Sequence, residues 1–292
     1  DKIRELAELT INKKTQLAAG WAIQRAQHGE MVHWAIINYA AMAGKIGKEG
    51  EGAGFSWHYG NGGMPQSGQK MPIGLSQGRN PISATCPVVL VPKMLNNPGM
   101  SFTRNGETLT FPKAKMIYNS GNNLLSHQQD TNELIQALND HVDTIVCQDP
   151  WWCAAARYAD IVLPATTTLE RNDISSGGTY SNNKIYAMRQ VIEPVGESWD
   201  DYKIFSNLAF LFNVQDQFTE GKTMMQHLED AYHSSSATES FATFWDKGIT
   251  VLPTPQTANN YVRHGDFYQD PIKHALHTPS GKIELYSETI AN

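Results

Sequence analysis

Residues 116–171 read MIYNSGNNLLSHQQDTNELIQALNDHVDTIVCQDPWWCAAARYADIVLPATTTLER. Three short apolar runs in this stretch indicate β-strands, at Met116–Tyr118, Thr144–Cys147 and Ile161–Leu163. Two helical patterns separate the strands, at Asp130–Asp140 and Ala154–Ala159. Strands that alternate with helices are typical of a parallel sheet, so we predict an α/β fold with a doubly wound, mostly parallel sheet flanked by helices.

A polar loop follows each of the three predicted strands: Ser120–Asn123, Gln148–Asp149 and Pro164–Asp173. Right-handed crossovers place the carboxyl ends of parallel strands at one edge of the sheet, where open α/β sheets bind ligands. Asn, Asp and Gly also occur in ordinary turns, so one such loop would be weak evidence, but three at one edge favour a ligand site. The adjacent Trp151 and Trp152 are predicted to pack beneath this edge.

The side chains of these loops suit a purine nucleotide. A carboxylate such as that of Asp149 can accept hydrogen bonds from N1–H and N2–H2 of guanine, and an amide such as that of Asn122 or Gln148 can satisfy O6 or a ribose hydroxyl. The guanidinium of Arg171 can bind a phosphate through two hydrogen bonds. The sequence therefore predicts a purine nucleotide at this edge.

The composition excludes two classes of partner. The 23 Lys and Arg residues are outnumbered by 29 Asp and Glu residues, which gives a net charge of −6. A protein that binds DNA or RNA through its phosphates needs an excess of positive charge, so we predict no nucleic-acid partner. No apolar run approaches the ~18 residues of a membrane helix, so we predict no membrane span.

Cys86, Cys147 and Cys153 match neither a zinc site nor a disulfide framework and are predicted to be unpaired thiols.

The chain as a whole is predicted to contain three segments. Residues 1–30 form the end of a preceding α/β segment, residues 31–215 form a nucleotide-binding α/β domain, and residues 216–292 form a helical and connecting region. Residues 44–110, rich in Gly, Pro, Ser and Asn, are predicted to be a long loop. Within this segment, Asn105–Gly106 predicts a β-hairpin at the surface. The glycines of this loop lack the preceding strand and following helix of a dinucleotide-binding fingerprint.

Longer motifs carry a resemblance to a known family. They are Gly20–Arg25, His28–Glu30, Trp57–Tyr59, Ala159–Asp173 and Thr278–Glu284. Through these motifs the chain resembles the dimethyl sulfoxide reductase superfamily, whose molybdenum enzymes bind a pair of molybdopterin guanine dinucleotides. The resemblance is closest to the branch of trimethylamine-N-oxide reductase and its dimethyl sulfoxide and biotin sulfoxide relatives. Family members are much longer, and the chain is similar to their central part. The resemblance therefore implies a fragment, with the molybdenum-ligating serine before it and a C-terminal barrel after it.

The resemblance also implies contacts with the cofactor, Mo-bis(molybdopterin guanine dinucleotide). Trp21, Gln24 and Arg25 would approach one pterin dinucleotide, and Ser181 and Asn182 would lie near a pterin. The nucleotide and its phosphates would be contacted by Gly121, Asn122, Asn123, Gln148, Asp149, Arg171, Asp173 and Asp201. Four of these residues also follow from the strand-end loops alone, namely Asn122, Gln148, Asp149 and Arg171.

The function that the resemblance implies is reduction of trimethylamine N-oxide, or of a related N-oxide or S-oxide, by oxygen-atom transfer to molybdenum. It further implies a c-type cytochrome as electron donor and a periplasmic location, reached through a signal segment outside this chain. The fragment alone is expected to show no turnover. The alternative hypothesis is a different α/β nucleotide-binding domain, for NAD or a flavin, or a relative that lost the metal. The missing glycine fingerprint counts against that alternative.

Overall fold

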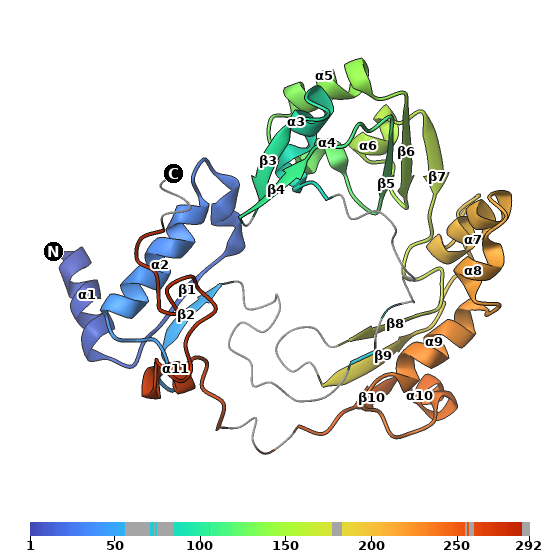
Figure 1. The fold of residues 1–292 in the computed structure, drawn as a ribbon. Helices are drawn as coiled ribbons and strands as arrows, with labels where there is room; N and C mark the ends of the chain where they lie inside the picture. The colour runs from blue at the N-terminus through green and yellow to red at the C-terminus, as the bar shows by residue number, and fades with distance from the viewer. Residues whose placement is uncertain are drawn as a thin grey trace. The chain divides into compact units, whose positions relative to one another are not determined.

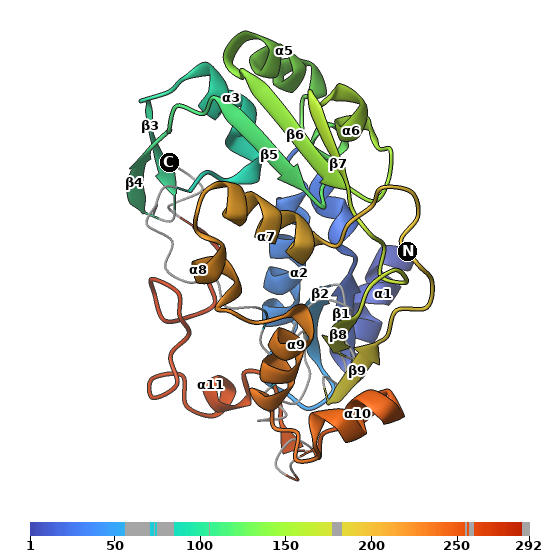
Figure 2. The same ribbon diagram turned by 90° about the vertical axis from the view of Figure 1, so that its right-hand side faces the viewer.

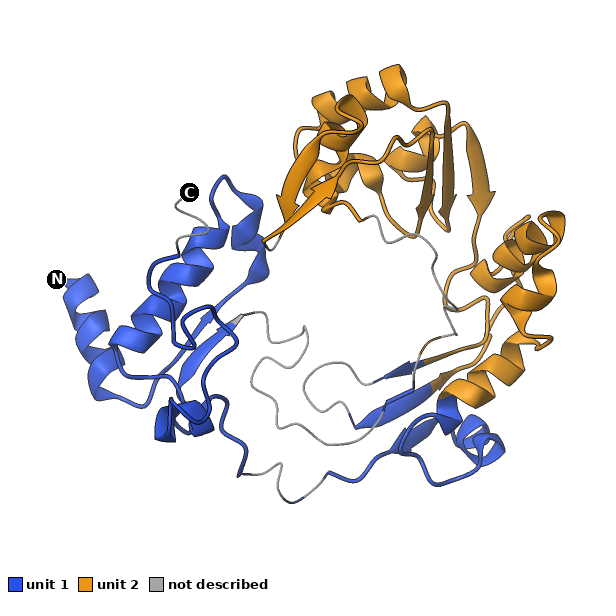
Figure 3. Cartoon of the chain, viewed as in Figure 1, with its two compact units in different colours: residues 1–72, 175–186, 232–292 blue, residues 73–174, 187–231 orange. Residues whose placement is uncertain are grey.

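The structure is a computed structural model that describes residues 1–55, 71–72, 74, 85–104, 106–176, 183–254, 256 and 260–287. The chain divides into two compact units (Figure 3). Unit 1 comprises residues 1–72, 175–186 and 232–292, and unit 2 comprises residues 73–174 and 187–231. Both units are discontinuous in sequence, because the chain returns to unit 1 at residue 175 and again at residue 232. We predicted continuous segments from the sequence, since local patterns do not report such returns.

Unit 2 contains the predicted parallel sheet. Its strands are β5 (Met116–Ser120), β6 (Thr144–Asp149) and β7 (Ile161–Pro164), and they lie in the order β5-β6-β7. Ser120 is paired with Gln148, and Gln148 with Leu163, so the three strands end at nearly the same level (Figure 1). The α/β class and the three strands of the sequence analysis are confirmed.

Helices cover one face of this sheet. They are α3 (Val91–Asn96), α4 (Leu124–His127), α5 (Thr131–His141) and α6 (Ala154–Tyr158). Their buried residues form one apolar cluster with Ile145 and Cys147 of β6: Met94, Leu95, Leu124, Leu134, Ala137, Leu138, Ala155 and Ala156. The Asp130 side chain accepts a hydrogen bond from the Glu133 backbone N–H and so caps the start of α5.

The opposite face of the sheet is covered by α7 (Asp201–Leu211). Side chains alternate between the two faces of a strand, so Gln148 of β6 points away from Cys147 and the apolar cluster. On that face the rings of Tyr118 and Phe205 lie 5.7 Å apart. The chain enters α7 beside β7, where Ala165 and Trp199 form a parallel bridge. Consequently α7 starts at the carboxyl ends of the strands, beyond their arrowheads in Figure 2.

The prediction of a long loop over residues 44–110 is wrong for part of that segment. It contains β2 (Gly52–Phe55), the 3-10 helix η2 (Val88–Leu90) and α3. Met94 and Leu95 of α3 are buried in the apolar cluster, and this tertiary packing orders a segment whose composition is typical of a loop. The predicted hairpin is confirmed as β3 (Ser101–Arg104) and β4 (Glu107–Thr110).

Unit 1 begins with α1 (Lys2–Asn12), β1 (Gln16–Ala19), η1 (Trp21–Arg25) and α2 (Glu30–Met42). β1 pairs in parallel with β2, with Gln16 opposite Gly52. The remaining elements are α8 (Gln215–Thr219), α9 (Met224–His233), α10 (Phe241–Lys247), α11 (Gly265–Gln269), and a sheet of order β10-β9-β8 from Ile249–Val251, Lys184–Met188 and Asp173–Ser176. None of the helices in the described ranges is long and apolar enough to cross a membrane.

Candidate cofactor site

The central feature of the site is a chain of hydrogen bonds that ends on a carboxylate. Gln148, the penultimate residue of β6, is only 1% exposed. Its Oε1 accepts a hydrogen bond from the Tyr118 hydroxyl at 2.5 Å, and its Nε2 donates to Asp201 Oδ1 at 2.6 Å. Burial, and then the nearby Asp201 carboxylate, raise the pKa of the Tyr118 hydroxyl, which keeps it a donor. The Asp201 side chain is thereby fixed at the carboxyl ends of the strands.

The loop after β5 contributes two amides that also hold the local backbone. Asn123 Oδ1 accepts from the Ala155 N–H at 3.1 Å and so satisfies a free donor in the first turn of α6. Asn122 Oδ1 lies 2.6 Å from His127 Nδ1. Gly121 has φ +63°, which favours glycine, and no atom lies within 4 Å of the position that a Cβ would take. The loop therefore has open space beside Gly121.

The loop after β6 presents two large side chains to solvent. Asp149 Oδ1 accepts from the Trp151 N–H at 2.8 Å, which shapes the turn. Trp151 is 70% exposed and Trp152 is 64% exposed. The prediction that both pack beneath the sheet edge is wrong. Aromatic residues usually pack in a core, but α3 to α6 and α7 already fill both faces of this sheet.

The loop after β7 is organised by a buried carboxylate. Glu170 is 6% exposed. Its Oε2 accepts from the hydroxyl and the backbone N–H of Thr167, both at 2.7 Å, and its Oε1 accepts from the Val195 N–H at 2.7 Å. These hydrogen bonds, those of Thr167 first, lower the pKa of Glu170 below its usual range. Glu170 is thus ionised at neutral pH and holds the loop in one conformation.

Arg171 lies on this ordered loop. Its Nη1 donates to Thr166 O at 2.8 Å, and its Nε lies 3.5 Å from Asp173 Oδ2. These contacts leave Nη2 without a partner among the described residues. Thr166 is 3% exposed, and its Oγ1 is buried with no hydrogen-bond partner there. Such an orphaned polar atom is uncommon in a folded protein and points to a missing partner.

These loops and the start of α7 form what we call the strand-end edge: Gly121–Asn123, Gln148–Asp149, Thr166–Asp173 and Asp201. It contains every predicted cofactor residue of unit 2. Thr166 was placed in the polar loop after β7 without a role of its own, and Tyr118 was missed. The alternation of β5 offered a signal for Tyr118, which pairs with Val146 and so lies diagonal to Gln148.

The other predicted residues lie in unit 1 or outside the described residues. Trp21, Gln24 and Arg25 share the 3-10 helix η1 and are exposed. Trp21 lines a pocket of about 660 Å³ together with Trp34 and residues of the Thr278–Glu284 motif. The Trp34 indole donates to Glu284 O at 2.8 Å, which joins this motif to α2. Ser181 and Asn182 lie outside the residues that the structure describes.

The comparisons with known proteins identify the family of the chain. A family model described as molybdopterin oxidoreductase matches residues 5–210. The chain belongs to the molybdopterin oxidoreductase family. It is 42% identical to the dimethyl sulfoxide/trimethylamine N-oxide reductase of Cereibacter sphaeroides and 37% identical to the trimethylamine-N-oxide reductase of Haemophilus influenzae, over 99% of its length in each case. It spans 37% and 38% of the lengths of these two relatives.

A similar solved structure is that of acetylene hydratase from Pelobacter acetylenicus. The matched region covers 61% of the present chain and 22% of the acetylene hydratase chain, with 22% sequence identity and a TM-score of 0.41. Membership of the molybdopterin oxidoreductase family implies a molybdenum–pterin cofactor.

The residues at the strand-end edge fit one arm of such a cofactor. Asp149 and Asp201 each have a carboxylate oxygen, Oδ2, that is not engaged by the described residues, and Arg171 has an unengaged Nη2. The two carboxylate oxygens can accept hydrogen bonds, and the Arg171 Nη2 can bind an anion. The orphaned Thr166 Oγ1 lies in the same loop as Arg171, and the open space beside Gly121 lies in the loop after β5.

Proposed function

We propose that the strand-end edge binds the guanosine of a molybdopterin guanine dinucleotide. The observation that carries this proposal is the hydrogen-bond chain Tyr118–Gln148–Asp201, which uses a buried amide to fix one carboxylate at the carboxyl ends of a parallel sheet. Guanine presents N1–H and N2–H2 as adjacent donors, and a carboxylate accepts from both. The location is the one at which open α/β sheets bind nucleotides.

The other residues of the edge have complementary roles in this proposal. Asp149 offers a second acceptor for the guanosine, and Arg171 with Asp173 faces the phosphates. Asn122 and Asn123 shape the loop that the nucleotide passes. Lys203, whose Nζ lies 4.2 Å from the Trp199 ring centroid, adds positive charge in the first turn of α7.

In unit 1, we assign the pocket beside Trp21 to the pterin end of a dinucleotide. Trp21 supplies an apolar face, and Lys48 and Arg263 of the pocket lining supply positive charge. Burial, and to a smaller extent the charge of Arg263, lower the pKa of His264, so this imidazole is neutral at neutral pH. Gln24 and Arg25 extend the same surface from η1, and Ser181 and Asn182 complete the proposed set.

The intact protein, on this proposal, reduces trimethylamine N-oxide or a related N-oxide or S-oxide. The bound Mo-bis(molybdopterin guanine dinucleotide) supplies the oxygen-atom transfer, and the residues of this chain hold and orient it. A c-type cytochrome donates the electrons, and the enzyme works in the periplasm. The names of the relatives support this activity, and dimethyl sulfoxide and biotin sulfoxide are the rival substrates.

The test is the composition of the complete protein purified from cells supplied with molybdate. Molybdenum is measured by mass spectrometry, and guanine is released by acid and measured by chromatography. The proposal requires two guanines for each molybdenum. Molybdenum without guanine would leave a pterin enzyme but remove the nucleotide from the strand-end edge. Absence of both would favour the alternative, a nucleotide-binding domain of another class. Turnover of the three oxides then ranks the substrates.

A further inference from the structure

Trp151 and Trp152 are the most exposed tryptophans near the strand-end edge, where Trp199 is 42% exposed. They are 70% and 64% exposed, and neither indole contacts another aromatic ring or makes a hydrogen bond among the described residues. An indole in water loses the favourable burial that makes tryptophan a core residue. Two adjacent indoles in this state, two and three residues after Asp149, therefore indicate a surface that something covers.

The loop that carries them is held at both ends. The Trp151 N–H donates to Asp149 Oδ1 at 2.8 Å, and the Trp151 carbonyl accepts from the Cys153 N–H at 2.7 Å. Cys153 is the residue before α6, whose Ala155 and Ala156 are buried in the apolar cluster. The backbone beneath the indoles is thus preorganised, so a ligand that covers them has only their side-chain torsions to order.

We infer that the Trp151–Trp152 pair provides the face on which the guanine base stacks. This inference rests on the proposed function and adds a division of roles to it. The Asp149 and Asp201 carboxylates bind the edge of the base and identify it as guanine, whereas an indole covers its flat face and excludes water. Stacking accepts any purine, because every base has a π-face, so the indoles set the affinity and the carboxylates set the preference.

The experiment measures binding of guanosine 5′-monophosphate and inosine 5′-monophosphate by equilibrium dialysis to the complete protein, purified without cofactor. The variants are Trp151→Leu, Trp152→Leu, Trp151→Phe and Trp152→Phe. Leucine keeps an apolar side chain but removes the ring, and phenylalanine restores a ring. Phe212→Leu is the matched control, because Phe212 is 75% exposed in the same unit but follows the far end of α7.

At least one leucine variant should bind both nucleotides between about fivefold and about a hundredfold more weakly, with their affinity ratio unchanged. The matching phenylalanine variant should recover most of the affinity, and Phe212→Leu should bind like the parent. Parent affinity in both leucine variants would overturn the stacking role and leave the guanine site intact, assigning the indoles to a contact with another part of the polypeptide. A parent protein that binds neither nucleotide would overturn the guanine site itself, and the stacking with it.

Discussion

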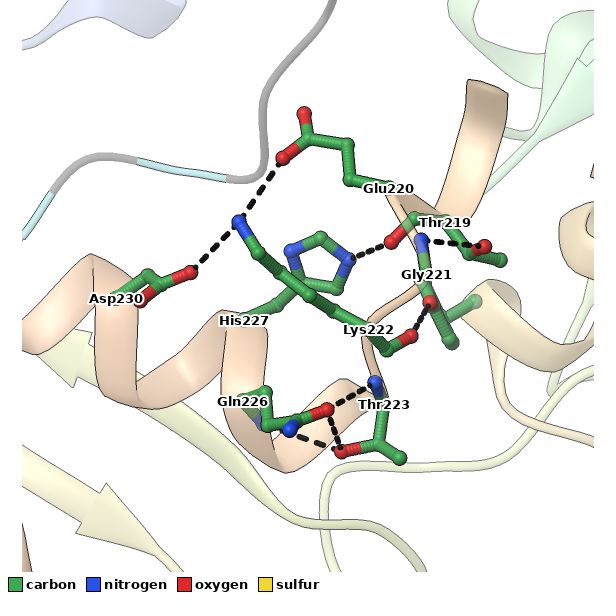
Figure 4. Close-up of polar contacts among 9 residues, drawn as sticks. Thr219, Glu220, Gly221, Lys222, Thr223, Gln226, His227 and Asp230 are labelled. Atoms are coloured by element: carbon green, nitrogen blue, oxygen red, sulfur yellow. Dashed lines mark hydrogen bonds and ion pairs between the residues drawn. The ribbon is translucent and has the colours of Figure 1, made fainter. Parts of the chain in front are cut away.

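Two polar regions of unit 2 have similar composition but different hydrogen bonding. One is the α8–α9 corner, which comprises Thr219, Glu220, Lys222, Thr223, Gln226, His227 and Asp230 (Figure 4). There Lys222 Nζ lies 3.0 Å from both Glu220 Oε2 and Asp230 Oδ2, and His227 Nε2 donates to Thr219 O at 2.9 Å. Each of these groups has a partner on the corner itself. The other region is the strand-end edge.

The strand-end edge differs because its hydrogen bonding is incomplete. Thr166 Oγ1 is buried without a partner, and the outer atoms of Asp149, Arg171 and Asp201 are unengaged among the described residues. A cluster of charges by itself therefore does not separate a binding site from a structural joint. The buried Thr166 Oγ1 does, because a buried polar atom without a partner costs free energy that a ligand can recover, whereas exposed carboxylates such as Asp230 leave one oxygen unengaged by the described residues in either region.

The largest effect on stability should come from His227→Ala. His227 is 7% exposed, and its ring meets that of Tyr202 edge-on at 5.5 Å. Removing it takes away this packing and the hydrogen bond to Thr219 O, so the free energy of unfolding should fall by about 2 to 4 kcal/mol in urea denaturation. Binding of guanosine 5′-monophosphate by the folded protein should not change. A loss of binding with unchanged stability would show that the corner belongs to the site.

The next effect is on binding and should come from Asp201→Asn. Asparagine still offers Oδ1 to Gln148 Nε2, so the buried amide keeps its acceptor and stability should change little. Loss of the charge should weaken binding of guanosine 5′-monophosphate by about 1 to 3 kcal/mol. The preference over inosine 5′-monophosphate should fall as well. The matched control is Asp230→Asn on the α8–α9 corner, which removes a carboxylate without touching the edge. Equal losses in the two variants would refute the comparison.

A smaller effect, of about tenfold in affinity, should come from Arg171→Ala. Because we assign Arg171 to a phosphate, the loss should be seen with guanosine 5′-monophosphate and not with guanosine, which has no phosphate. Lys115→Ala is the control, because Lys115 forms a more exposed ion pair with Asp143, at 3.0 Å, near the amino ends of β5 and β6 and away from the strand-end edge. Equal weakening of nucleoside and nucleotide would mean that Arg171 acts only through the loop, by its hydrogen bond to Thr166 O.

The strand-end edge could be predicted from local sequence because its parts are local. Short apolar runs fix the strands, and the residues after each run fix the loops, so Asn122, Gln148, Asp149 and Arg171 were identified without any relative. The contact from Gln148 to Asp201 spans 53 residues, and no local pattern reports it. Asp201 was named only through the resemblance, as were Trp21, Gln24 and Arg25.

The errors of the sequence analysis also have physical causes. The segment Val88–Leu95 was assigned to a loop because Gly- and Pro-rich sequence precedes it, and its order comes from packing in the apolar cluster. Trp151 and Trp152 were assigned to the interior because indoles are usually buried. Both errors concern burial, which depends on the tertiary structure and on what binds to it, more than on local sequence.

The smallest effect should come from Lys222→Met on the α8–α9 corner. The side chains of this ion pair are 38% to 58% exposed, and exposed pairs contribute little. Asp230, and then Glu220, raise the pKa of Lys222 above its ordinary 10.5. The folded state therefore holds the proton more tightly than the unfolded state, so the contribution is present below pH 10.5 and is lost as the pH rises through the raised pKa.

Thermal unfolding of the parent and of Lys222→Met should thus differ slightly at neutral pH and coincide in strong base. About 0.5 M NaCl should also remove the difference, because exposed charges are screened at that ionic strength. A difference that persisted in salt would mean that the methionine disturbs packing and that the ion pair is not its cause. Nucleotide binding should be unaffected under all of these conditions, since Lys222 already has both of its carboxylate partners on the corner.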